Sequence, residues 1–192
     1  EEALVIGNGT MGATLYGGVK KDKISFNDIT LWTGEPESEN SSPDAFNTIP
    51  EIRALLDNED YQGADKAQYK VQGHYSENYQ PLGTLTIEYL DDTIGISDYH
   101  RWLDIGNATA RTQYLKGGKL FTSDYFASAP DSVIVIRLKS ENKEGIYALL
   151  SFDSPLPHSS QVADNEISVE GYAAYHSFPV YYKAEDKHRY CL

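Results

Sequence analysis

The chain has almost no cysteine: Cys191 is the single thiol among its 192 residues. One cysteine cannot form an internal disulfide framework or a cysteine-based zinc site. Basic residues are also few, because 16 Lys and Arg stand against 29 Asp and Glu, a formal charge of −13 at pH 7. Such a chain repels phosphate backbones and anionic lipid, so we expect no nucleic-acid partner. Apolar runs reach only about four residues, far below the roughly 20 needed to cross a bilayer, so no membrane span is expected.

Aromatic and turn-forming residues are what the chain has in abundance. It contains 15 Tyr, 6 Phe and 2 Trp, together with 15 Gly and 8 Pro. This composition favours an all-β domain that handles neutral ligands, sugars among them. A plainer interpretation is that the tyrosines of the strands simply face both the core and water.

Alternation of apolar and polar residues predicts strands along most of the chain. Leu85, Ile87 and Tyr89, for example, alternate with polar neighbours. About ten such segments, spaced roughly 8–12 residues apart, predict an all-β, mainly antiparallel β-sandwich. Trp102 lies in one of these segments and is expected in the core. Further predicted strands are residues 3–6, 13–19, 23–27, 119–127, 132–139, 145–152, 165–170 and 178–184.

One stretch, residues 48–72, has helical rather than alternating spacing. Apolar residues recur there at helical intervals from Ile49 onward. Pro50 is expected in the first turn, with Thr48 as a candidate cap, and a second short helix is expected after Asn58. The pattern predicts a short helical hairpin inserted among the strands.

Residues 7–12 match Gly-x-Gly-x-x-Gly, the fingerprint of dinucleotide-binding folds. That motif needs a helix N-terminus beneath the pyrophosphate. The pair Gly17-Gly18 follows, and it would cost a helix about 2 kcal/mol. The rest of the chain offers no alternating strand–helix units. We therefore expect a glycine-rich β-turn between two strands, and not a nucleotide site.

The acids and histidines show no pattern of a catalytic or metal site. Paired carboxylates could hydrolyse a glycosidic bond, but the acids lie in charged loops and at helix ends, where solvated surface acids are the rule. None of the 5 His has the spacing of metal ligands on one face. We nominate no catalytic residue, no metal and no cofactor. The acids considered are Glu35, Glu37, Glu39, Asp57, Glu59, Asp60, Asp91 and Asp92.

Two segments, residues 27–34 and 79–83, combine Gly, Pro, aromatic and amide groups outside the regular strands. Loops of this kind commonly carry binding residues. An aromatic face suits the apolar CH groups of sugars, and a tryptophan with one wet end is also common at interfaces. The candidates for contact with a substrate or with another domain are Asn27, Trp32, Tyr79 and Gln80.

Several short segments, taken in order over residues 3–138, resemble the opening of glycoside hydrolase family 95. Each segment is moderately specific, and the ordered set is strongly so. Two of them are Asn-Asp-Ile-Thr-Leu-Trp-Thr-Gly at residues 27–34 and Tyr-Gln-Pro-Leu-Gly-Thr-Leu at residues 79–85. Two positions depart from the family pattern. Ile29 stands where the family usually has an acid, and Thr84 stands where it usually has Asp.

This family consists of α-L-fucosidases, some of which act on α-L-galactosides. The resemblance implies that residues 1–192 form an N-terminal β-sandwich domain, of the supersandwich type, truncated at both ends. A C-terminal (α/α)6 barrel, absent from these residues, would carry an inverting hydrolysis, so this fragment alone is expected to be inactive. The expected partners are that barrel and, through the whole enzyme, fucosylated glycans, in the periplasm or outside the cell. A free-standing carbohydrate-binding module and a purely structural scaffold remain alternatives.

Overall fold

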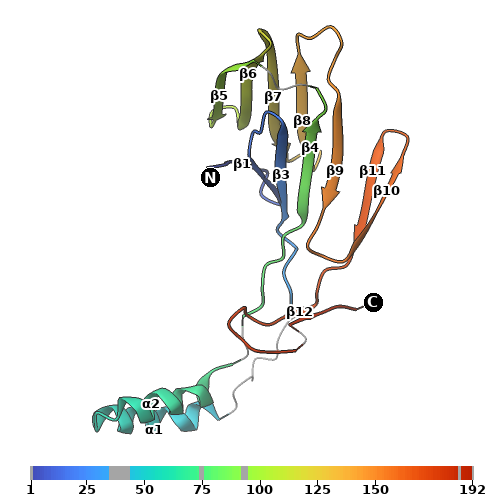
Figure 1. Ribbon diagram of the computed structural model, residues 1–192. Helices are drawn as coiled ribbons and strands as arrows, with labels where there is room; N and C mark the ends of the chain where they lie inside the picture. The colour runs from blue at the N-terminus through green and yellow to red at the C-terminus, as the bar shows by residue number, and fades with distance from the viewer. Residues whose placement is uncertain (1, 35–43, 74–75, 92–94, 186, 192) are drawn as a thin grey trace. The chain divides into compact units, whose positions relative to one another are not determined.

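The computed structural model describes residues 2–34, 44–73, 76–91, 95–185 and 187–191. The chain divides into two compact units, whose elements are labelled in Figure 1. The first, called here the sandwich unit, comprises Glu1–Trp32, Tyr79–Ala174 and Tyr190–Leu192. The second, called the helical unit, comprises Thr33–Asn78 and Tyr175–Arg189.

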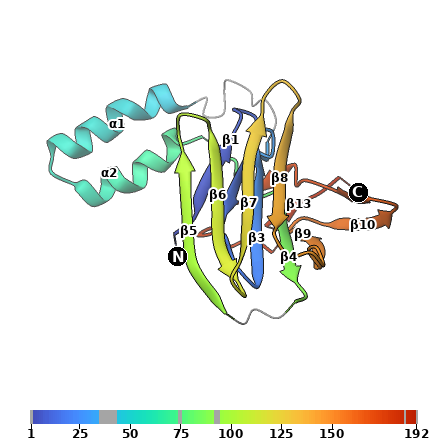
Figure 2. The ribbon, with the colours of Figure 1, turned by 90° about the horizontal axis from the view of Figure 1, so that it is seen from above.

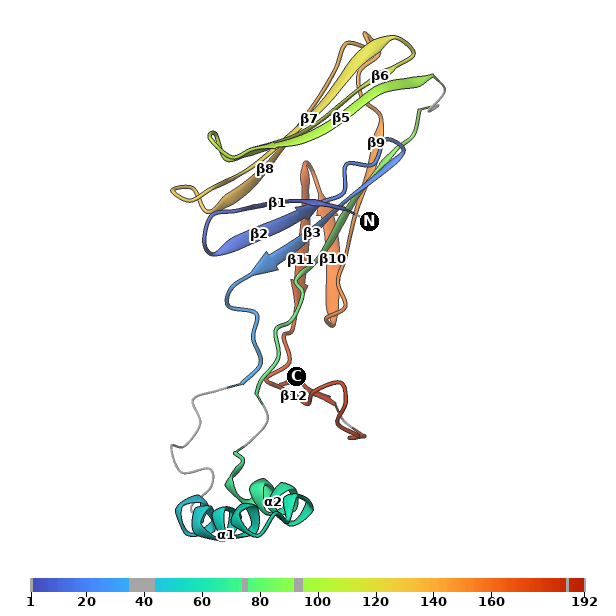
Figure 3. The same ribbon diagram turned by 90° about the vertical axis from the view of Figure 1, so that its left-hand side faces the viewer.

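Two antiparallel sheets pack face to face to form the core of the sandwich unit in the described part of the chain, which confirms the predicted fold class (Figures 2 and 3). One sheet has the strand order β1-β2-β3-β4-β9 and the other has the order β5-β6-β7-β8. The first contains β1 (Leu4–Gly7), β2 (Met11–Leu15), β3 (Lys21–Asp28), β4 (Gly83–Tyr89) and β9 (Ala148–Asp153). The second contains β5 (Ile96–Asp104), β6 (Thr109–Lys116), β7 (Lys119–Ser128) and β8 (Val133–Ser140).

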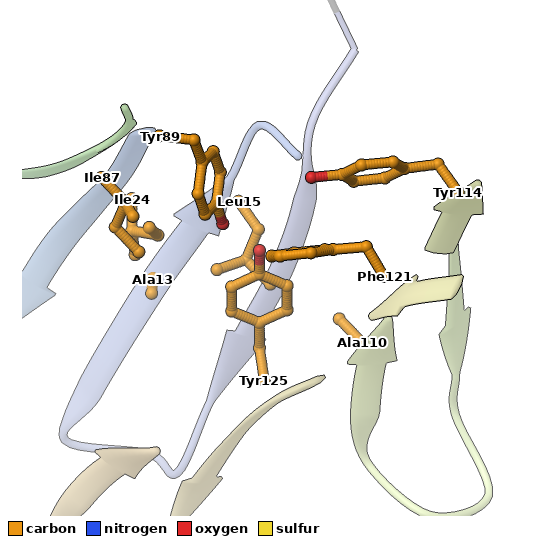
Figure 4. Packing of buried hydrophobic residues seen from close by; sticks show 9 residues of the cluster. All are labelled: Ala13, Leu15, Ile24, Ile87, Tyr89, Ala110, Tyr114, Phe121 and Tyr125. Atoms are coloured by element: carbon orange, nitrogen blue, oxygen red, sulfur yellow. The ribbon is translucent and has the colours of Figure 1, made fainter. Parts of the chain in front are cut away.

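Aromatic rings fill much of the space between the two sheets (Figure 4). Tyr89 of β4 lies edge-on to Phe121 of β7, with ring centroids 5.2 Å apart. Phe121 in turn stacks on Tyr114 of β6, with centroids 5.0 Å apart. Several tyrosines are therefore core residues, as the plainer interpretation of the composition holds. Smaller and aliphatic side chains complete the cluster: Ala13, Leu15, Ile24, Ile87 and Ala110.

A buried carboxylate joins the two sheets. Asp22 of β3 is 1% exposed, and its Oδ1 accepts hydrogen bonds from the backbone N–H groups of Gly18 and Lys23, both at 2.9 Å. Its Oδ2 accepts a hydrogen bond of 2.6 Å from the hydroxyl of Tyr125 on β7. Burial and the nearby Asp22 charge hold the pKa of Tyr125 above its ordinary value, so this hydroxyl stays protonated and donates. Asp22 thus has the hydrogen-bond partners that a buried charge needs.

The glycine-rich motif lies in a hairpin, as predicted. β1 and β2 pair antiparallel up to Gly7 and Gly12. The Oδ1 atom of Asn8 accepts hydrogen bonds from the N–H groups of Thr10 and Met11 at 3.1 and 2.8 Å. Because a strand and not a helix follows the glycines, this turn lacks the helix N-terminus on which a dinucleotide would bind.

The helical unit contains the predicted helical hairpin, formed by α1 (Ala45–Asp57) and α2 (Tyr61–Gln68), which the short 3-10 helix η1 (Tyr69–Val71) follows. The predicted start was wrong. The helix already begins at Ala45, so Pro50 lies inside it. Thr48 does not cap it, because its hydroxyl donates to the Asp44 carbonyl at 3.0 Å. Among the described residues, neither helix is long and apolar enough to span a membrane.

In the last part of the chain the predicted strand at residues 165–170 is confirmed as β11 (Glu166–Gly171), whereas another predicted strand is not found. A hairpin of β10 (His158–Ala163) and β11 belongs to the sandwich unit. The predicted strand at residues 178–184 is wrong, because the Tyr182 N–H bonds the Pro179 carbonyl in a turn. Proline also has no N–H to give to a strand ladder. The helical unit instead has the short antiparallel pair β12 (His176–Ser177) and β13 (His188–Arg189).

Candidate functional site

The two candidate segments lie side by side just beyond the paired part of β3 and β4. The strand pairing runs up to Phe26 and Gly83, and an antiparallel bridge forms again at Trp32 and Tyr79. Five residues of one chain segment and three of the other separate these two pairs. The first segment must therefore bulge out of the ladder, as strands commonly do beside functional sites.

A turn at Asp28 takes up the extra residues. The Oδ1 atom of Asp28 accepts hydrogen bonds from the hydroxyl and the N–H of Thr30, at 2.5 and 2.9 Å. These two bonds lower the pKa of Asp28, the hydroxyl bond more strongly. Asp28 is thus a local turn former that stays ionised at neutral pH. Ile29, at the tip, is 57% exposed, so this departure from the family pattern puts an apolar side chain in water.

Trp32 and Tyr79 form an aromatic pair on the sandwich unit. Their rings meet edge to face, with centroids 5.9 Å apart. Trp32 is 56% exposed, whereas the Tyr79 hydroxyl is buried and has no hydrogen-bond partner among the described residues. Burial raises the pKa of Tyr79, and the negative charge of Asp28 adds to this. The exposed Trp32 ring can therefore offer its apolar face to a partner. The Tyr79 hydroxyl beside it is buried and stays protonated.

Gln80 serves as a clamp within the sandwich unit. Its Nε2 donates to the carbonyl of Ala174 and its Oε1 accepts from the N–H of Ala174, both at 2.9 Å. Its own N–H donates to the Leu31 carbonyl at 2.7 Å. The side chain is buried, so both ends of its amide are engaged in holding three chain segments together. Gln80 therefore positions Trp32 and Tyr79, and its contact with a substrate or a second domain stays a prediction.

Asn27 stands apart from the aromatic pair. It lies on β3 opposite Gly12 of β2, with an exposed side chain. The structure therefore brings together Trp32, Tyr79 and Gln80 of the four candidates and leaves Asn27 on the strand.

The acidic residues occupy the surface positions that the sequence predicts, where the structure describes them. Asp57 and Glu59 are exposed, Asp60 caps α2 by accepting from the Gly63 N–H, and Asp91 pairs with Lys116 at 2.6 Å. Among the described residues, no group of three or more His, Cys, Asp or Glu is placed to hold a metal ion. Four of the acids considered lie outside the described residues: Glu35, Glu37, Glu39 and Asp92.

A polar network in the helical unit was not predicted from the sequence. Glu77 Oε1 lies 2.7 Å from His176 Nδ1, and its Oε2 accepts from the hydroxyl of Thr33 and from the N–H of Ser177. Burial opposes ionisation of Glu77, but the hydrogen bonds from Thr33, His176 and Ser177 outweigh it and lower its pKa. Because 99 residues separate Glu77 from His176, no local motif could have revealed the pairing.

The features above define an antiparallel β-sandwich with an inserted helical hairpin and an aromatic pair of which one ring, that of Trp32, is exposed. Over residues 1–190 the chain matches the family described as "Glycosyl hydrolase family 65, N-terminal domain", and it belongs to that family. Enzymes of glycoside hydrolase family 95 share this N-terminal domain, so the resemblance found in the sequence is confirmed.

Three curated relatives are α-fucosidases by name. The chain is 33% identical to Alpha-L-fucosidase 2 of Arabidopsis thaliana over 174 residues, 88% of the chain and 20% of that protein. It is 29% identical to the Probable alpha-fucosidase A of Aspergillus oryzae over 145 residues, 72% of the chain and 20% of that protein. The corresponding Aspergillus niger protein is 29% identical over 180 residues, 88% of the chain and 22% of that protein. The chain thus spans about a fifth of the length of these relatives.

Proposed function

We propose that this chain is the N-terminal domain of an α-L-fucosidase-like glycoside hydrolase. The parent enzyme would hydrolyse terminal α-L-fucosyl or α-L-galactosyl linkages with inversion, in a C-terminal (α/α)6 barrel. The sandwich unit would support that barrel, and the fragment alone would be inactive. The observation that carries the proposal is the family match over residues 1–190, together with α-fucosidase relatives of which the chain spans about a fifth.

The activity is tested on the complete reading frame and on the 192-residue chain, side by side. The complete protein should release fucose from a fucosyl-α-1,2-galactoside, and the chain alone should release none. Proton NMR of the first product should show the β-anomer, because inversion replaces the α-linkage from the opposite face. Turnover by the isolated chain would place the chemistry inside these residues and overturn the assignment, as would a complete protein without hydrolase activity.

The role proposed for the aromatic pair is contact with the barrel at the rim of its sugar pocket. Trp32→Ala removes an exposed ring whose bridge to Tyr79 is made by backbone, so the fold should survive. In the complete enzyme we expect a drop of about tenfold in kcat/KM, the size of effect when one aromatic contact worth about 1.4 kcal/mol is lost. Tyr147→Ala, which truncates another exposed ring of the sandwich unit, is the matched control and should change kcat/KM less than twofold.

A carbohydrate-binding module is a second candidate, and the exposed Trp32 ring is the observation that favours it. Calorimetry of the 192-residue chain against fucosylated oligosaccharides distinguishes a binding module from a domain that only contacts the barrel. Binding at millimolar concentration or tighter, lost in Trp32→Ala but kept in Tyr147→Ala, would support the module. No binding, combined with a weakened complete Trp32→Ala enzyme, would support the contact with the barrel.

A further inference from the structure

A cavity of about 430 Å³ opens beside the candidate segments, within the sandwich unit. Its walls come from both candidate segments, from β9 and the segment after it, and from the β10–β11 hairpin and the residues that follow it. Among the apolar side chains that line it are Leu31, Leu82, Phe152, Leu156, Ile167 and Val169.

The hairpin gives this cavity an apolar wall through its register. Ile167 pairs with Val162, and Val169 pairs with Ser160. Strand side chains alternate between two faces. Val162, Ile167 and Val169 therefore share one face of the hairpin, and Glu166, Ser168 and Glu170 share the other. The cavity is lined by Ile167 and Val169, whereas Val162, farther along the same face, is 76% exposed.

Two polar side chains at the cavity, Ser154 and His158, already bond backbone carbonyls within the chain. The Ser154 hydroxyl donates to the Leu82 carbonyl at 2.7 Å, and His158 Nδ1 donates to the Leu156 carbonyl at 2.9 Å. Sites that bind sugars or ions need polar groups that converge on the ligand. These walls offer mainly CH surface, so they fit an uncharged, apolar occupant.

The cavity is continuous with the candidate segments. Leu31 directly precedes Trp32, and its carbonyl accepts the N–H of Gln80. Leu82 follows Gln80 by two residues. A partner that covers the Trp32–Tyr79 pair would therefore also reach the mouth of the cavity, and a bulky side chain would fill it.

We propose that the cavity receives a bulky apolar side chain from the part of the parent polypeptide that lies outside these 192 residues. The inference rests on the proposed function, because the relatives are about five times as long as the stretch that the chain matches. A second copy is a poor occupant, since each copy carries a charge of −13 and the two would repel. The cavity would thus anchor the rest of the enzyme beside the aromatic pair.

The test places a thiol in the cavity and measures whether the complete protein protects it. Val169→Cys, in a Cys191→Ser background, puts a small reactive group on the cavity wall. Val162→Cys is the matched control on the same face of the hairpin. Rates of modification by a bulky aromatic disulfide reagent are compared in the 192-residue chain and in the complete protein. The complete protein with Val162 and Val169 unchanged gives the modification rate of any other thiols, and this rate is subtracted.

The cysteine at position 169 should react at least tenfold more slowly in the complete protein than in the 192-residue chain. The cysteine at position 162 should change less than twofold. Equal rates at position 169 would overturn the proposal, and so would protection in the 192-residue chain that grows with its concentration, because the occupant would then be a second copy. If Val169→Cys fails to fold, Ile167→Cys reports on the same wall. Fucose release is measured separately, so protection in a protein without hydrolase activity would contradict the proposed function alone.

Discussion

Replacing Asp22 with alanine is expected to lower the free energy of unfolding by at least about 3 kcal/mol. The substitution removes the acceptor of the Gly18 and Lys23 N–H groups and of the Tyr125 hydroxyl. The Tyr125 hydroxyl is buried, and a buried donor left without a partner costs about 1–3 kcal/mol. The two part-buried N–H groups add to this loss, and native domains are stable by only about 5–15 kcal/mol. Urea unfolding of the 192-residue chain, followed by circular dichroism, should show a lower midpoint with an unchanged slope.

Two tyrosines provide matched controls for this result. Tyr125 and Tyr114 are both 1% exposed, but only the Tyr125 hydroxyl bonds Asp22, whereas the Tyr114 hydroxyl has no partner among the described residues. Tyr125→Phe should therefore cost about 1.5–3 kcal/mol, and Tyr114→Phe should cost nothing or add stability. Equal losses in the two variants, or an Asp22→Ala change within about 0.5 kcal/mol, would show that the carboxylate does not hold the sheets together.

Most of the architecture could be predicted because it rests on local patterns. Alternation indicates strands wherever one face is buried, and the glycine-rich turn and the helical hairpin follow from nearby residues. The start of α1 could not be predicted, because Thr48 has the chemistry of a cap but its hydroxyl bonds a carbonyl one turn earlier. The strand expected at residues 178–184 failed for a similar reason, since Pro179 forms a turn.

Alternation does not say which of two faces is buried, and the predicted core position of Trp102 shows this. Trp102 is 40% exposed, and the guanidinium of Arg111, its partner on β6, lies 5.7 Å from its ring centroid. Its neighbour Arg101 instead shares the inner face with the buried Thr112. There it donates to the Tyr16 carbonyl at 2.5 Å and to the Glu2 carbonyl at 2.8 Å. A charged residue can face inward at a sheet edge when backbone carbonyls accept its hydrogen bonds.

The two segments of the candidate site could be chosen from the sequence, but the contacts of each residue could not. Composition alone pointed to the segments that carry Trp32 and Tyr79, and the structure brings these two together. The amide of Gln80 was a candidate for contact with a substrate or with another domain, and in the structure it bonds the backbone of Ala174, 94 residues away. Partners this distant along the chain leave no local signal, so only the folded structure separates a positioning residue from one that faces a partner.

Gly83, the glycine of the motif that contains Gln80, should tolerate no side chain. Its φ of +153° lies in a region that L-residues avoid. A Cβ atom there would lie 2.4 Å from Cζ of Phe152 and 2.6 Å from the carbonyl oxygen of Asp153. Gly83→Ala is therefore expected to cost about 3–5 kcal/mol, from backbone strain of about 1–3 kcal/mol and overpacking of similar size. The strain falls on the β4–β9 pairing, beside the end of the candidate segment at residues 79–83.

Gly145→Ala separates the two contributions. Gly145 also has a positive φ, +89°, but among the described residues nothing lies within 4 Å of the position that a Cβ atom would occupy there. This variant should lose only the backbone strain, about 1–2 kcal/mol. Urea unfolding measures both losses, and hydrogen exchange should show faster exchange of the β9 amides in Gly83→Ala alone. Equal losses in the two variants would mean that Phe152 and Asp153 move aside, so the close packing against β9 would not be the reason for glycine in the motif.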